Sequence, residues 1–146
     1  LETSGDLPKV EVLPPAGQKR WGGKTLGIPA PMDVDRIMKT VPKGKVITVK
    51  EIRERVAASL GADVGCPLTS GIFTWIAANA AEEDRQAGKT RITPWWRTLK
   101  SGGELNPKFP GGLDAQAALL EAEGQSIVTR GTRRFVADYE KKLPRS

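Results

Sequence analysis

The sequence predicts a mainly α-helical fold with a small β component, organised as a winged helix-turn-helix. Three observations predict it. Helical periodicity begins near residue 33 and continues through three segments to Gly88. Only a short turn containing Pro67 separates the second segment from the third, as in a helix-turn-helix. An alternating basic stretch near the C-terminus then supplies a candidate wing.

Residues 1–30 are expected to precede this domain as an extended arm. They contain five glycines and several prolines, with no sustained period of 3.6 or 2. Trp21 or Leu26 would pin such an arm to the domain, and a loosely ordered tail is the alternative. The chain of 146 residues therefore divides into an arm over 1–30 and a winged helix-turn-helix domain over 31–146.

The first two helices have clear boundaries and apolar faces. Val34, Ile37, Met38 and Val41 form one stripe at helical spacing, which Pro42 and Gly44 end. A short β-branched stretch over 45–47 follows. Thr48 and Glu51 then make a Thr-x-x-Glu capping box for a second helix, which ends at Gly61. Its predicted buried face consists of Val49, Ile52, Val56 and Leu60.

The third helix is predicted to begin at Thr69 or Ser70 and to end before Gly88. Its expected core face consists of Ile72, Phe73, Ile76, Ala77 and Ala80. A short helix over Leu113–Ala122 and a hairpin over 126–138, turning at Arg130-Gly131, complete the domain.

Composition excludes several classes of chemistry. The chain has 23 Lys and Arg against 17 Asp and Glu, a net charge of +6 that favours a polyanionic partner. It has no histidine, which excludes an imidazole base or ligand. Its single cysteine, Cys66, excludes an internal disulfide and a thiolate zinc cluster, so we expect no metal and no cofactor. No long apolar run or signal pattern occurs, which predicts a soluble cytoplasmic or nucleoid-associated monomer without a membrane partner.

The segment over 89–100 combines cations with aromatic rings. Lys89, Arg91 and Arg97 surround the pair Trp95-Trp96, and the segment contains no acidic residue. Cations bind phosphates, and indole faces stack on unpaired bases, so the pattern favours a nucleic-acid-binding site. The alternative is that both tryptophans belong to the core and the charges form a solvated face.

The first turn of the third helix is the candidate for entering a DNA groove. Thr69, Ser70 and Gly71 are small, so the backbone there can approach DNA and donate N–H groups to phosphate. The same residues are also ordinary helix caps. No Arg, Lys or Gln precedes Arg85 in this helix, so it has few side chains that could read the base sequence in the major groove.

Five motifs in order, over residues 34–139, resemble the DNA-binding domain of the O6-alkylguanine-DNA alkyltransferases. They resemble the non-enzymatic alkyltransferase-like proteins more closely, which implies a fold like the alkyltransferase C-terminal domain. The residues that carry the resemblance are Val41-Pro42-Lys43-Gly44-Lys45-Val46, Pro94-Trp95-Trp96-Arg97, Gly102-Gly103-Glu104-Leu105, Phe109-Pro110-Gly111-Gly112-Leu113 and Leu119-Leu120-Glu121-Ala122-Glu123-Gly124.

The departures from the family pattern concern its reactive centre. The enzymes have Pro-Cys-His-Arg, and a glutamate and the histidine activate the cysteine. Glu123 matches that glutamate, but Trp95 and Trp96 stand at the cysteine and histidine positions, so this site cannot transfer an alkyl group. Val49 replaces the family's tyrosine, and Ser70 falls near its intercalating arginine when Asn79 is aligned with the family's asparagine.

The resemblance implies a lesion pocket formed by Trp95, Trp96, Thr98, Phe109, Pro110 and Gly111. The expected function is therefore recognition of O6-alkylguanine in duplex DNA without alkyl transfer, which marks the lesion for downstream repair proteins. A general DNA-binding regulator or nucleoid-type protein is the alternative. A third hypothesis makes Cys66 a displaced alkyl acceptor, although an inert buried thiol is the favoured interpretation.

Overall fold

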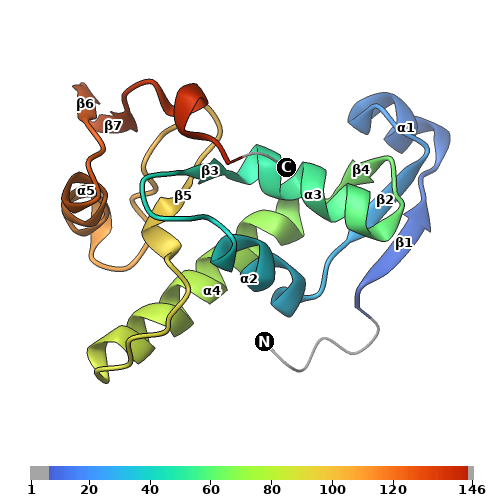
Figure 1. Ribbon diagram of the computed structural model, residues 1–146. Helices are drawn as coiled ribbons and strands as arrows, with labels where there is room; N and C mark the ends of the chain where they lie inside the picture. Colours follow the sequence, from blue (N-terminus) through green and yellow to red (C-terminus); the bar gives the residue numbers. More distant parts are fainter. Residues whose placement is uncertain (1–6, 145–146) are drawn as a thin grey trace.

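The computed structural model describes residues 7–144 (Figure 1). The first six residues of the expected arm and the last two of the expected domain lie outside the described residues. The helices are Pro15–Trp21 (α1), Pro31–Lys39 (α2), Val49–Leu60 (α3), Pro67–Gln86 (α4) and Gly112–Ala122 (α5). The strands are Lys9–Val12 (β1), Thr25–Ile28 (β2), Ile47–Thr48 (β3), Val64–Gly65 (β4), Thr98–Leu99 (β5), Ile127–Arg130 (β6) and Arg133–Val136 (β7), with 3₁₀ turns at Trp95–Arg97 (η1) and Tyr139–Lys142 (η2).

Helices α2, α3 and α4 pack around the main core and confirm the predicted helix-turn-helix. The predicted stripe of α2 supplies Val34 and Met38 to this core, and Val41 follows directly after the helix. The predicted capping box of α3 is present, since the Thr48 backbone N–H donates to Glu51 Oε1 at 3.0 Å. Gly61 ends α3 in the left-handed conformation, with φ of 65°.

Helix α4 differs from its prediction at its start and in its buried face. It begins at Pro67 with Cys66 as the N-cap, because proline fits the first helical position. Small side chains form the buried face, since α4 packs against both α2 and α3. Of the predicted face, Ala77 is buried, Phe73 is partly buried and Ile72 is 45% exposed. The buried residues of α4 are Ser70, Thr74, Ala77, Ala78 and Ala81.

Residues 7–30, here called the N-terminal unit, contain regular structure where an extended arm was expected. Strand β1 pairs antiparallel with β2, and β2 pairs parallel with β4 in the turn before α4. A small core joins the unit to β4 and the start of α4. It contains Leu13, Leu26 and Cys66, with Trp21, Ile28 and Val64 against it. Leu26 therefore does anchor this segment. The elements are four to seven residues long, too short to produce a visible period in the sequence.

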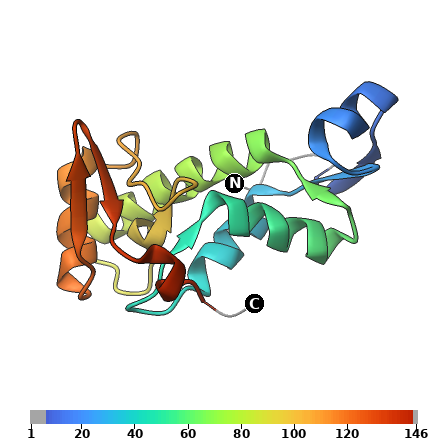
Figure 2. The ribbon, with the colours of Figure 1, turned by 90° about the horizontal axis from the view of Figure 1, so that it is seen from above.

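The C-terminal part contains the predicted helix and hairpin. Strands β6 and β7 pair antiparallel from Ile127↔Val136 to Arg130↔Arg133, which confirms the wing. Parallel pairing of β3 with β5 joins the helix-turn-helix to this part. A second core lies between α5 and the wing and contains Val46, Leu99, Leu105, Ala117, Leu120 and Val136. Seen from above, the N-terminal unit and the wing lie at opposite ends, with α3 and α4 between them (Figure 2).

Candidate nucleic-acid interface

Trp95 lies in the core. It begins the 3₁₀ turn η1 between α4 and β5, and its side chain is only 1% exposed. Its ring contacts those of Trp96 and Phe109 edge to face, with centroids 5.9 and 5.8 Å apart. The indole Nε1 donates to Glu82 Oε1 at 3.2 Å. A packed position with a satisfied N–H makes Trp95 a rigid support for this part of the molecule.

The Glu82 carboxylate that receives this bond is held in its charged form. Hydrogen bonds from Arg85 lower the pKa of Glu82 most, and bonds from Gln86 and the Trp95 indole lower it further, against the opposing effect of burial. A charged acceptor strengthens the bond from Trp95. Glu82 thereby connects α4 to η1 across 13 residues of sequence.

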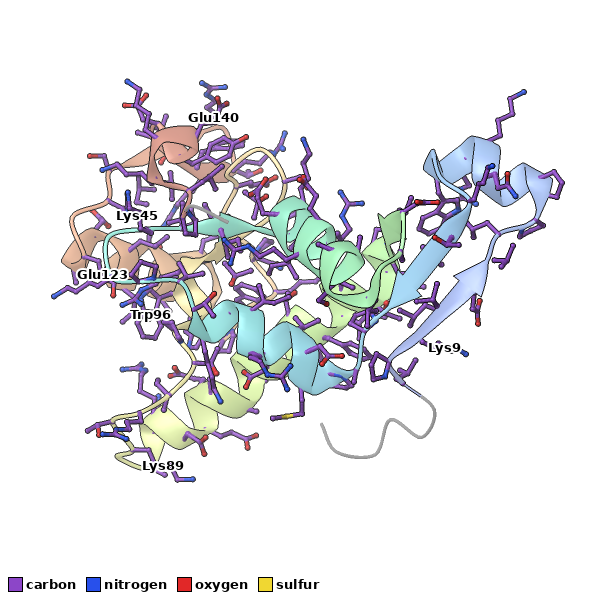
Figure 3. The ribbon with its side chains drawn as sticks, turned by 45° about the vertical axis from the view of Figure 1, so that its right-hand side comes forward. Lys9, Lys45, Lys89, Trp96, Glu123 and Glu140 are labelled. Atoms are coloured by element: carbon purple, nitrogen blue, oxygen red, sulfur yellow. The ribbon has the colours of Figure 1, made fainter. Side chains whose placement is uncertain are left out.

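Arg97 is held inside the protein by three acceptor atoms. Its Nε and Nη2 donate to the two carboxylate oxygens of Glu123 at 2.9 and 2.5 Å, and its Nη1 donates to the Val41 carbonyl at 2.7 Å. The guanidinium also lies 5.6 Å from the centroid of the Trp96 ring. Trp96 and Glu123 lie close together beneath the C-terminal part of the chain (Figure 3). With its side chain 13% exposed, Arg97 has a structural role and not the expected phosphate contact.

The six residues of the expected lesion pocket lie in one region but mostly as packed core. Trp95, Thr98 and Phe109 are buried, Trp96 and Pro110 are half-buried, and Gly111 is exposed. The buried Gln116 side chain ties the strand to the turn by donating to the carbonyls of Trp96 and Thr98. Any base recognised here would therefore meet the exposed edge of an aromatic cluster.

The expected DNA contacts lie at opposite ends of α4. Thr69, Ser70 and Gly71 occupy its first turns, whereas Lys89 and Arg91 follow its last turn, about 30 Å away by the rise of a 20-residue helix. Ser70 is fully buried, so it faces the core and not a partner. Lys89 is 64% exposed and pairs with Asp84 at 3.1 Å, at the far end of α4 (Figure 3). Only the exposed members of this set are available to DNA.

A groove that was not predicted from the sequence lies beside the first half of α4. Exposed Leu68, Ile72 and Trp75 form its helical wall, and the Trp75 indole Nε1 donates to the Lys108 carbonyl on the opposite wall at 2.9 Å. Its cavity volume is about 570 Å³, and its lining residues are Pro67, Leu68, Gly71, Ile72, Trp75, Asn106 and Lys108. The sequence does contain a pattern that indicates this groove: Leu68, Ile72 and Trp75 stand at i, i+4 and i+7, opposite a face of small residues.

The described residues contain neither a candidate metal site nor a helix that could span a membrane. Residues 7–144 contain no group of three or more His, Cys, Asp or Glu side chains arranged to hold a metal ion. Within the same range, no helix has both the length and the apolar character needed to cross a membrane.

The fold is similar to that of solved structures of a DNA-binding protein. No protein-family model and no curated protein sequence matches the chain. S. pombe Atl1, in complex with damaged DNA containing O6-carboxymethylguanine, superposes with a TM-score of 0.56 at 19% identity. S. pombe ATL in complex with DNA gives a TM-score of 0.56 at 18% identity, and each comparison covers 80% of this chain and 94% of that one. The likeness confirms the predicted mainly α, alkyltransferase-like fold.

Proposed function

We propose that this protein binds duplex DNA, recognises O6-alkylguanine without alkyl transfer and marks the lesion for other repair proteins. The observation that carries the proposal is the shared fold with Atl1, a protein seen on damaged DNA containing O6-carboxymethylguanine. The Pro94-Trp95-Trp96-Arg97 motif supports it, because the aromatic cluster stands where the related enzymes carry their reactive cysteine.

The absence of alkyl transfer follows from the chemistry of that motif. An indole has no thiolate form and accepts no alkyl group under conditions in which a thiolate does. Cys66, the one thiol of the sequence, packs with Leu13 and Leu26 in a different cluster from Trp95. Binding therefore replaces reaction at this site.

DNA approaches the first half of α4, the second helix of the helix-turn-helix. The acidic run Glu82-Glu83-Asp84 begins in the second half of α4 and disfavours close approach of phosphates there. Gly71 leaves space at the helix surface, since a Cβ atom at this position would meet no atom within 4 Å. Lys89 and Arg91, exposed beyond the last turn, contact flanking phosphates.

The test is a titration of matched duplexes with and without O6-methylguanine, at two salt concentrations, followed by tryptophan fluorescence. Tighter binding of the modified duplex at both concentrations is expected. Replacing both Lys89 and Arg91 with alanine should lower the slope of log Kd against log salt by about two, as two phosphate contacts are lost. Lys45→Ala, at an exposed cation outside the basic-aromatic segment over 89–100, is the matched control.

A general DNA-binding regulator is the second candidate, and the burial of Trp95 favours it because a buried ring offers a base no face to stack on. Equal affinity for modified and unmodified duplexes, with a steep salt dependence, would select this function. An added alkyl mass on the peptide containing Cys66 after incubation with alkylated DNA would instead contradict both binding-only functions.

A further inference from the structure

Strand β1 leaves one side of the N-terminal sheet open. The strand order is β1-β2-β4, so β1 lies at an edge and pairs with no described strand except β2 (Figure 1). Two of its four residues carry exposed apolar side chains, with Val10 44% and Val12 80% exposed. An open strand edge of this kind is a template for pairing with another strand.

The hydrogen bonds of β2 show which backbone groups of β1 are available to a partner. Gly27 lies opposite Val10, and its carbonyl accepts the Cys66 N–H on the side of β2 that faces β4. The N–H of Thr25, opposite Val12, is also used on that side. Because bonded and non-bonded pairs alternate along antiparallel strands, the N–H and C=O groups of Val10 and Val12 point away from β2.

The charged residues of β1 are complementary to those of a second copy of the same strand. Lys9 and Glu11 share one face of β1 and form an ion pair at 3.1 Å. When two copies pair antiparallel with Val10 opposite Val10, Lys9 of each copy lies opposite Glu11 of the other. Centring the pair on Lys9 or Glu11 would instead place like charges opposite each other, and centring it on Val12 would run past the end of the strand. One register therefore satisfies both the charges and the outward backbone groups.

We propose that two copies of this chain associate through β1 in an antiparallel, twofold-symmetric pair centred on Val10. Each Val10 N–H donates to the Val10 carbonyl of the other copy, and each Val12 N–H donates to the Pro8 carbonyl. Lys9 and Glu11 fix the register across the pair. A contact this short belongs to the weak, transient class of interfaces, so the monomer predicted from the sequence is the form present at low concentration.

The dimer goes beyond the proposed function and does not depend on it. None of the described residues that line the groove beside α4 belongs to β1, and the wing lies at the other end of the molecule (Figure 2). Pairing through β1 therefore leaves both of these surfaces open in each copy. Association is measured without DNA, so its result is separate from that of the duplex titration.

Exchange of the charges tests the register in solution. Sedimentation velocity of the full chain, in a concentration series up to about 1 mM, should show a monomer–dimer equilibrium. Glu11→Lys places lysines opposite each other and should weaken association about tenfold or more. Lys9→Glu combined with Glu11→Lys restores opposite charges and should recover the wild-type affinity to within about threefold. Glu121→Lys, at an exposed position on α5, makes the same change in net charge as Glu11→Lys and should leave association unchanged.

Disulfide trapping separates pairing through β1 from random collision. In the proposed register the Val10 Cα atoms of the two copies lie about 5.5 Å apart, within the range that a disulfide spans. The Val12 Cα atoms lie about 14 Å apart along the paired strands. Val10→Cys should therefore cross-link faster than Val12→Cys in a glutathione buffer, although Val12 is the more exposed position. Cys66 is buried and present in both variants, so its contribution is matched.

Three results would overturn the dimer. A monomer at every concentration would show that β1 does not pair with a second copy. Association that Glu11→Lys leaves unchanged would show that the copies meet at another surface. Faster cross-linking of Val12→Cys than of Val10→Cys would exclude the register centred on Val10. The proposed function would survive each of these results, because it is decided by the affinities for modified and unmodified duplexes.

Discussion

Arg97 and Glu123 form a largely buried ion pair whose loss should be costly. Replacing Arg97 with alanine leaves the Glu123 carboxylate and the Val41 carbonyl without their donors. We expect the free energy of unfolding to fall by about 3–5 kcal/mol, because a buried charge is left unpaired. Urea denaturation measures the change. Lys89→Ala, which breaks the exposed pair with Asp84, should cost under about 1 kcal/mol and serves as control.

Glu104 should make the stability of the protein depend on pH. Its pKa is lowered chiefly by the hydrogen bonds from Arg133, with a further contribution from Lys100. A carboxyl with a lowered pKa in the folded state stabilises the protein fully above the ordinary glutamate pKa. That contribution is lost as the pH falls through the lowered value.

The variant Glu104→Gln tests this expectation. The difference in unfolding free energy between wild type and variant should be present at pH 7 and should shrink below the ordinary glutamate pKa, measured by urea denaturation across that range. Glu121→Gln, at an exposed position on α5, is the control. A difference that stays constant from neutral to acid pH would show that the charge of Glu104 is not what stabilises the fold.

The basic-aromatic segment shows why single residues of the site were only partly predictable. Its pattern is compatible with an interface and with a core, and the structure divides it between the two. Trp95 and Arg97 point inward, where they donate to Glu82 and Glu123. These two acceptors lie 13 and 26 residues away in the sequence. Lys89 and Lys100 stay outside. Long-range partners of this kind leave no local signal.

At the scale of elements, the approach of β4 to α3 depends on a glycine. A Cβ atom at Gly65 would lie 2.1 Å from the Arg53 carbonyl oxygen, which belongs to backbone and cannot turn away. Gly65→Ala should therefore lower the free energy of unfolding by about 1–3 kcal/mol, as overpacking does. Gly71→Ala is the matched control, because its Cβ meets no atom within 4 Å.

The control variant Gly71→Ala also has an expected effect on stability. Alanine favours a helix over glycine by up to about 1 kcal/mol, so Gly71→Ala should leave stability unchanged or raised. Thermal and urea unfolding of both variants give the comparison. Equal stability of Gly65→Ala and wild type would mean that the turn between α3 and α4 moves apart at no cost, contrary to the close packing described above.

The sequence predicted α2 and α3 from local patterns, but it did not predict which face of α4 is buried. The stripe of α2 and the capping box of α3 depend on neighbouring residues, so both follow from the sequence. Helix α4 has apolar residues nearly all round, and which side is buried depends on how closely α2 approaches it. The buried face of α4 consists of small residues, because only small side chains allow α2 to approach this closely. Ile72 and Trp75 therefore lie on the exposed face.

At the scale of the whole molecule, the N-terminal unit is joined to the helix-turn-helix by a strand pairing that sequence patterns do not reveal. Leu26↔Val64 and Gly27↔Gly65 pair in parallel across 38 residues. Asp63 strengthens the junction by accepting the backbone N–H groups of Lys24 and Thr25 at 3.0 and 3.2 Å. These two bonds are also the main cause of the lowered pKa of Asp63. The winged helix-turn-helix itself was predictable, because its turns and caps are local.

The small core of the N-terminal unit should open independently of the rest of the molecule, and Cys66 reports on it. Cys66 is the only cysteine and is 7% exposed beneath Leu13 and Leu26. Leu26→Ala creates a cavity there, at a cost of about 2–5 kcal/mol that falls on the least extensive of the three cores. Labelling of Cys66 by a thiol reagent should therefore become much faster under native conditions, with circular dichroism nearly unchanged.

Leu120→Ala separates this local opening from global unfolding. It makes the same change in the core between α5 and the wing, where Leu120 is fully buried. It should lower the global stability without accelerating the labelling of Cys66 in the native protein, because the N-terminal unit stays closed. Equal acceleration by both variants would mean that Cys66 becomes accessible only when the whole chain unfolds. The three cores would then form one cooperative unit, and the junction at β2 and β4 would be as stable as the helix-turn-helix it joins.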